Sequence, residues 1–279
     1  MRFFFLFYNG WRLGITRLGI IRDNVSLLLF PVMSTISLVM VCLTFFGWFY
    51  AVFGIDLEAA FESVFESEAM VYIGLFIFYL INYSIIVFFN VGLVHCARLI
   101  LSGEEARVAD GLAYSAKRLP TILSWAVLAA TVGVVLQILE ERLGWIGQIV
   151  VGIIGLVWSV TTYFVVPIIA YEDVTPIKAV KRSAQILKEK WGEAIGANFS
   201  FSLFYIVGYI AIGLMVFLLF SIHPLVAIII GVMTGLLLHT VVSAAQTVFL
   251  AAAYQHVINE PVRHFDSDAL DGIFIERRK

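Results

Sequence analysis

A histidine stands well inside the apolar stretch 224–256, where an ionisable side chain is unusual. His239, Ser243 and Gln246 follow one another at i, i+4 and i+7, so a helix places them on one face. Ionisable residues at membrane depth usually face the bundle interior and often belong to ion or proton pathways. The alternative is a neutral histidine that hydrogen-bonds across helices, as polar intramembrane residues commonly do. We favour this packing role and keep conduction open.

Polar residues in other apolar stretches extend this group into a candidate polar seam. Asn82 and Asn90 lie eight residues apart, about two helical turns, so they share a face of the stretch 71–100. Such a seam would either wet a pore or specify helix packing, and the residue types do not choose between the two. The candidate seam consists of Asn82, Asn90, His95, Asn198, His239, Ser243 and Gln246.

Motifs for catalysis or cofactor binding are missing from the sequence. There is no P-loop, no G-x-S-x-G, no H-E-x-x-H and no paired-cysteine motif. The acidic residues Asp266, Asp268 and Asp271 have the wrong spacing for a calcium loop. Cys42 and Cys96 lie in apolar runs and are typical of small core residues rather than of a disulfide framework. We therefore predict no catalytic residues, no metal and no cofactor.

The composition places these residues in a membrane protein. Of the 279 residues, 61% are hydrophobic and 14% are charged, and the mean hydropathy is +0.98. A soluble domain is about 25% charged. Six runs reach the roughly 20 apolar residues that cross a bilayer. They lie near 27–53, 71–100, 121–139, 145–170, 195–220 and 224–256.

The basic residues predict an orientation. In the six-span arrangement, 17 of the 18 lysines and arginines lie on one side of the membrane, and Arg142 alone lies on the other. Basic residues near span ends favour the cytoplasmic side, so both termini are predicted to be cytoplasmic. Few basic residues occur in any one segment, so nucleic acid is not implied.

The cytoplasmic segments 7–24, 104–120 and 176–191 each have helical apolar spacing and basic residues. In the third, Thr175 suits an N-cap and Pro176 the first helical position. Its predicted apolar face is Ile177, Val180, Ala184, Leu187 and Trp191, and that of 104–120 is Val108, Leu112, Ala116 and Leu119. Basic amphipathic helices lie in the headgroup plane of anionic membranes. The candidate contacts with anionic lipid are Arg12, Arg17, Lys117, Arg118, Lys178, Lys181, Arg182 and Lys188.

These segments predict three repeats, each an interfacial helix followed by a two-span hairpin. The repeats are about 1–101, 102–172 and 173–258, they form one transmembrane domain (1–258), and a cytoplasmic tail (259–279) follows. Local similarity between AYSAKRLPTIL and VKRSAQILKEK supports the repeat. The alternative is that cytoplasmic loops of membrane proteins are generally basic and sometimes helical. The predicted fold is an all-α polytopic bundle.

Two further features leave alternatives. Glu172 and Asp173 precede the third interfacial helix, where they would either cap its N-terminus or form a salt bridge with a basic residue of another repeat. Gly231 and Gly235 form a GxxxG motif, for which close packing within the bundle is favoured over self-association.

Two stretches, WSVTTYFVVPIIAYEDVTPIKAVKRSAQILKEKWGE (158–193) and GWRL…RDNVSLLLFP (10–31), carry a resemblance. The chain resembles a bacterial membrane-protein family of unknown function. Its P-I-x-A-x-x-R-S helix is also similar to one in related six-span domains, such as the membrane domain attached to some glycerophosphodiester phosphodiesterases. The resemblance implies no established activity, and the soluble catalytic domain of those enzymes has no counterpart here.

We therefore expect a non-enzymatic protein of the bacterial cytoplasmic (inner) membrane that organises lipid or partner proteins, as a homo-oligomer. Its expected partners are membrane lipids, above all anionic headgroups of the inner leaflet. A channel or small transporter that uses the polar seam is the first alternative. A membrane-embedded enzyme that acts on lipid is the second and weaker one, because no nucleophile, base or metal cluster stands out.

Overall fold

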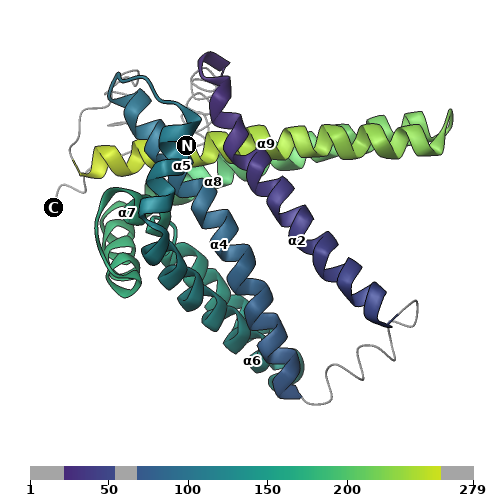
Figure 1. The fold of residues 1–279 in the computed structure, drawn as a ribbon, viewed down its shortest axis with the longest axis horizontal. Helices are drawn as coiled ribbons and strands as arrows, with labels where there is room; N and C mark the ends of the chain where they lie inside the picture. The colour runs from purple at the N-terminus through teal and green to yellow at the C-terminus, as the bar shows by residue number, and fades with distance from the viewer. Residues whose placement is uncertain (1–21, 54–67, 259–279) are drawn as a thin grey trace. The chain divides into compact units, whose positions relative to one another are not determined.

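The computed structural model describes residues 22–53 and 68–258, and every regular element in these two ranges is a helix. The predicted interfacial segment 7–24 therefore lies mostly outside the described residues, and the tail lies wholly outside them. Figure 1 labels the helices along the chain. They are η1 (Val25–Leu28), α2 (Leu29–Phe53), α4 (Glu68–Leu101), α5 (Val108–Lys117), α6 (Leu119–Thr161), α7 (Val165–Tyr171), α8 (Pro176–Phe220) and α9 (Pro224–Val257).

Five apolar stretches are long enough to cross a membrane, so the fold is an all-α, multi-pass membrane bundle. They are Val25–Phe45, Ala69–Leu101, Leu119–Trp145, Gly147–Tyr171 and Pro224–Val257. The sixth predicted span, 195–220, appears among the described residues only as the shorter apolar helix Phe204–Phe220. Six spans therefore remain a prediction.

The chain forms two compact units. The terminal unit contains the described residues up to 31, then 93–111 and those from 185 onward, and the central unit contains the described residues of 32–92 and 112–184. Four helices, α2, α4, α5 and α8, contain residues of both units. Each unit is described by itself below.

In the central unit, α4 and α6 run side by side (Figure 1). The hydroxyl of Tyr72 donates to Glu141 Oε2 at 2.7 Å, and Gln137 Nε2 donates to Glu141 Oε1 at 2.8 Å. The sequence predicts that the third span ends near 139, just before Glu140 and Glu141. The helix instead continues past both glutamates, since the carboxylate of Glu141 is held by these two donors.

A glycine turn divides α6 into two helical halves. Gly144 has φ 59° and ψ −142°, the only non-helical backbone inside α6, and a positive φ of this kind is open mainly to glycine. The rings of Trp125 and Trp158, one from each half, stack 5.9 Å apart with an angle of 10° between their planes. The loop predicted between spans three and four is therefore a turn at one residue.

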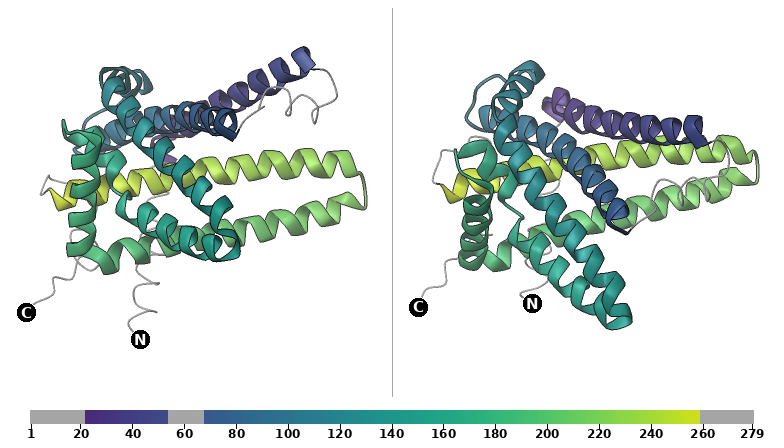
Figure 2. Two further views of the ribbon diagram at one scale, coloured as in Figure 1. Left: turned by 90° about the horizontal axis from the view of Figure 1, so that it is seen from below. Right: turned by 60° about the horizontal axis from the view of Figure 1, so that its bottom comes forward.

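In the terminal unit, the end of α8 and α9 form the predicted antiparallel hairpin (Figure 2). His223 caps α9, because its Nδ1 accepts from the Val226 N–H at 3.4 Å, and Pro224 is the first helical residue. A Cβ on Gly231 would lie 2.5 Å from Val216 Cγ2. Gly231 thus leaves room for Val216 of the neighbouring helix, which supports the favoured packing role for this glycine of the GxxxG motif, whereas a Cβ on Gly235 would lie 3.9 Å from Tyr209, an ordinary contact.

The packed core of the terminal unit lies around the last turns of α9. Tyr254 and Gln255 are fully buried, and Gln255 Nε2 donates to Ser102 Oγ at 3.1 Å. Cys96 is a buried free cysteine, which confirms its predicted role as a small core residue, and Cys42 in the central unit is free and half-buried. Asp110 accepts from the Arg107 N–H at 3.1 Å and so caps the start of α5.

The predicted boundary between the interfacial helix 176–191 and the span 195–220 is wrong. The chain is helical without interruption from Pro176 to Phe220. No proline follows Pro176 in this helix, and glycines in a helix interior cost only about 1 kcal/mol each. Gly192 and Gly196 are therefore tolerated where the sequence suggested a break.

Candidate functional site

The fourth span is broken near its end, and the polar groups of the central unit gather there. The second half of α6 ends at Thr161, and α7 begins at Val165. Pro167 explains the break, because proline has no N–H and its ring clashes with the carbonyl four residues earlier, here that of Tyr163. The sequence had placed Pro167 at the end of the span but had not predicted an interruption before it.

A side chain from α8 binds the backbone at this break. The N–H of Phe164 donates to Ser183 Oγ at 3.0 Å, and Ser183 is fully buried. Serine and threonine side chains of neighbouring helices commonly take up backbone groups that a broken membrane helix leaves over. Ser183 therefore fixes the start of α8 against the break in the fourth span.

Ser115 of α5 occupies the equivalent place in the second cytoplasmic helix. It is the eighth residue of α5, as Ser183 is the eighth of α8. Ser115 is also fully buried, and its Oγ donates to the carbonyl of Phe88 in α4 at 2.7 Å. The fourth residues of the two helices, Gly111 and Ala179, are buried too. Small residues four apart allow a helix to approach a neighbouring backbone closely.

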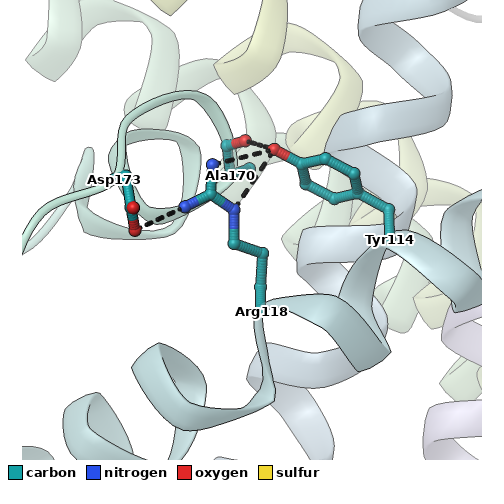
Figure 3. A network of polar contacts seen from close by, with 4 residues as sticks. All are labelled: Tyr114, Arg118, Ala170 and Asp173. Carbon is teal, nitrogen blue, oxygen red and sulfur yellow. Dashed lines mark hydrogen bonds and ion pairs between the residues drawn. The ribbon is translucent and has the colours of Figure 1, made fainter.

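Tyr114 of α5 and Arg118, the residue between α5 and α6, reach the loop between α7 and α8 (Figure 3). The Tyr114 hydroxyl donates to the Ala170 carbonyl at 2.5 Å and accepts from the Arg118 guanidinium at 3.3 and 3.4 Å. The same guanidinium lies 2.8 Å from Asp173 Oδ1. Arg118 thus joins the Tyr114 hydroxyl, which is bound to the Ala170 carbonyl, to the exposed carboxylate of Asp173.

A second ion pair holds the same loop from α8. Arg182 Nε lies 3.7 Å from Glu172 Oε1. We call the set Tyr114, Arg118, Arg182, Glu172 and Asp173 the polar clamp. Of the two roles expected for Glu172 and Asp173, the structure shows salt bridges, from Asp173 to Arg118 and from Glu172 to Arg182. That these pairs join different repeats stays a prediction.

The side chains of this site bind backbone groups and one another, and so they hold helices and a loop in place. The side chain of Asp173 is 89% exposed, and ion pairs with an exposed partner contribute only about 0–1 kcal/mol. The buried bonds made by the hydroxyls of Ser115 and Ser183 matter more. Loss of Ser183 would leave the Phe164 N–H without this acceptor, and a buried polar group that loses its partner costs about 1–3 kcal/mol. Within the described ranges, no three histidine, cysteine or acidic side chains are grouped closely enough to hold a metal ion.

A comparison with protein families covers the whole of this site. The model of a family of unknown function (DUF6159) matches residues 69–262. The chain belongs to this family. The match runs from the start of α4 to the end of α9 and so includes the polar clamp. No curated protein and no solved structure was found to match the chain.

The predicted polar seam of this DUF6159 protein is distributed over both units. Asn82 donates to the Phe78 carbonyl of its own helix at 2.7 Å, and it belongs with Asn90 to the central unit. His239 is exposed on α9, with Nδ1 3.5 Å from the Tyr205 hydroxyl. The half-buried residues His95, Ser243 and Gln246 belong with His239 to the terminal unit. The side chain of Asn198 lies outside the described residues, and the seam stays a prediction.

The eight predicted lipid contacts fall into three groups. Arg12 and Arg17 lie outside the described residues. Arg118 and Arg182 belong to the polar clamp, where carboxylates pair with them. The lysines Lys117, Lys178, Lys181 and Lys188 are exposed.

The structure shows which face of each cytoplasmic helix packs on protein, whereas the predicted contact of the apolar faces with lipid stays a prediction. On α8, Ile177 is 62% exposed, whereas Ala179, Ser183 and Ile186 are buried. On α5, Leu119 beyond its end is 41% exposed, whereas Ser115 is buried. Both helices bury the face with small residues because that face can approach another backbone. The shared signal was present in the sequence as S-A-x-x-L, at 115–119 and 183–187.

Proposed function

We propose that this DUF6159 protein is a non-enzymatic organiser of the membrane, which acts on lipids or partner proteins as a homo-oligomer. The observation that carries the proposal is that the polar side chains of the site bind the protein's own backbone and loop residues. The two buried hydroxyls that resemble candidate nucleophiles, those of Ser115 and Ser183, both bond to backbone groups. Arg118 and Arg182 both hold the α7–α8 loop. These groups position helices, which suits a scaffold.

We also infer the three-repeat organisation. The equivalent positions of Ser115 and Ser183, each the eighth residue of its helix, support it for the second and third repeats. The buried Gly111 and Ala179, each the fourth residue, support it as well. A cytoplasmic helix in each repeat would then carry a small-residue face that packs on protein and an opposite face that meets the membrane surface.

The contact between His239 and Tyr205 provides the test that separates a scaffold from a channel. We expect His239→Leu to lower the free energy of unfolding modestly, since intramembrane hydrogen bonds average about 0.6 kcal/mol. Tyr205→Phe should have a similar effect, and the double variant should cost no more than either change alone. The measurement is unfolding in detergent, together with ion and proton flux into vesicles that contain the full-length protein.

A scaffold shows no flux above empty vesicles in the wild type or in any variant, and it migrates as an oligomer. A wild type that conducts, with conduction altered by His239→Leu at unchanged stability, would replace the proposal with the channel. A monomer at all protein concentrations would remove the homo-oligomer from it.

We further propose that both termini are cytoplasmic and that the protein resides in the bacterial inner membrane. The support is the distribution of charge, with Arg142 alone among 18 basic residues on the outer side. In a variant without Cys42 and Cys96, cysteines placed at positions 63 and 221 should react with an impermeant thiol reagent in intact cells. A cysteine at position 267 should react only after the cells are opened, and its labelling in sealed cells would contradict this orientation.

A further inference from the structure

The first two turns of α8 present a cationic face directly opposite their buried face. Ala179 and Ser183 are fully buried, whereas Ile177, Lys178 and Lys181 are exposed. We call these three residues the lysine face. Because residues four apart lie on one side of a helix, Ile177 and Lys181 stand one above the other, and Lys178 flanks them.

The chain fixes how far this face lies from the hydrocarbon. The fourth candidate span ends at Tyr171, and α8 begins at Pro176. Tyr171 and Pro176 are five residues apart, so their Cα atoms lie at most about 18 Å apart when the chain between them is fully extended. The headgroup layer is about 5–7 Å thick on each side of the bilayer, and the Debye length adds about 8 Å at physiological ionic strength. The ion pair of Arg182 with Glu172, the first residue after the span, also holds the start of α8 close to the span end. The first turns of α8 therefore stay within electrostatic reach of the lipid phosphates.

The positive charge of the lysine face comes from Lys178 and Lys181, because the neighbouring Arg182 belongs to the polar clamp. Arg182, the next basic residue along the helix, is paired with Glu172 at 3.7 Å. Lys178 and Lys181 are exposed, and a lysine ammonium binds phosphate as a compact point charge on a flexible stem. Ile177, 62% exposed beside them, supplies the apolar contact that interfacial helices insert among headgroups.

We propose that the lysine face of α8 binds the phosphate groups of anionic phospholipids at the membrane surface. This inference rests on the proposed function as a membrane organiser and names its lipid class. The small-residue face of α8 holds the helix against the protein through Ser183, so the lysine face is presented in a fixed orientation. Arg118 and Arg182 serve the polar clamp and are not part of the lipid contact.

The test uses the full-length protein in a neutral detergent. Its thermal unfolding is followed during titration with phosphatidylglycerol or with phosphatidylcholine of the same acyl chains, because a ligand that binds the folded state raises the Tm. We expect phosphatidylglycerol to raise the Tm more than phosphatidylcholine does. Each lysine near an anionic surface contributes a factor of about five in affinity. Lys178→Gln with Lys181→Gln should thus weaken phosphatidylglycerol binding about thirtyfold.

Further variants test whether binding depends on the position of the lysines rather than on the total charge of the protein. Lys181→Gln alone should weaken binding about fivefold, whereas Arg142→Gln removes one charge elsewhere and should leave binding unchanged. Lys178→Arg with Lys181→Arg should retain the preference for phosphatidylglycerol. Inorganic phosphate at the same concentrations should leave the Tm unchanged.

Equal stabilisation by the two lipids, or unaltered binding by the double glutamine variant, would overturn the inference. A Tm rise with inorganic phosphate alone would overturn the lipid as the source of the phosphate. Oligomeric state and ion flux are measured on the same preparations. Loss of the lipid preference in an oligomeric, non-conducting protein refutes the lysine face alone, whereas a conducting or monomeric wild type refutes the proposed function.

Discussion

Ser183→Ala is expected to lower the free energy of unfolding by about 1–3 kcal/mol, the cost of removing the partner of a buried polar group. The Ser183 hydroxyl accepts from the Phe164 N–H at 3.0 Å in a fully buried position. The backbone at Phe164 lies in the break that Pro167 imposes on the fourth span, where the regular helical ladder is interrupted. Thermal or denaturant unfolding of the purified protein in detergent measures the change.

Two control variants make this expectation specific. Ser115→Ala, at the equivalent position of α5, should cost less, about 0.5–1.5 kcal/mol, because its hydroxyl donates to the Phe88 carbonyl of a continuous helix. Pro167→Ala allows the fourth span to continue as a helix. In that background Ser183→Ala should cost less than it does in the wild type. Identical costs in both backgrounds would show that Ser183 does not act on the break.

Gly144→Ala should also destabilise the protein by about 1–3 kcal/mol, the cost of a backbone conformation that L side chains rarely adopt. Gly144 has φ 59° and ψ −142°. A Cβ at this position would meet nothing within 4 Å, so the expected cost is backbone strain rather than a clash. The free energy of unfolding in detergent again gives the measurement.

Gly152→Ala is the matched control for this turn. Gly152 also has open space around its Cα, but it lies within a regular part of α6. Alanine there should stabilise the helix by about 0.5–1 kcal/mol. If both substitutions shifted stability in the same direction, the positive φ at Gly144 would not be what limits the residue at the turn.

The sequence by itself determined the elements that depend on local chemistry. Apolar length is enough to recognise a membrane-crossing helix, because about 20 apolar residues match the hydrocarbon thickness. The stretch predicted at 224–256 is α9, Pro224–Val257, and the stretch predicted at 71–100 is α4, Glu68–Leu101. The starts of α8 and α9 at prolines were equally readable, since the preference of proline for the first helical position is a property of that residue alone.

Polar residues in the sequence did not predict correctly where the third span ends. The break in the fourth span was also not predicted from the sequence. The third span extends past Glu141 because donors from Tyr72 and Gln137 hold its carboxylate. The break before Pro167 persists with a hydroxyl supplied from 19 residues away. In the first case a group distant along the chain stabilises a conformation that the local sequence disfavours. In the second, Pro167 imposes the break, and a distant hydroxyl binds the N–H group that the break leaves over.

Only the tertiary structure decided which faces of the cytoplasmic helices are buried and which cations are engaged. Helical periodicity shows that α5 and α8 are two-sided, but it does not distinguish a face that packs on protein from one that lies on headgroups. The Tyr114 hydroxyl finds the Ala170 carbonyl across 56 residues, and Arg118 finds Asp173 across 55. The face with the small residues Ala179 and Ser183 is the buried one, because another backbone can approach it closely. Whether such a backbone is present depends on a neighbouring element, which the sequence of the helix itself does not specify.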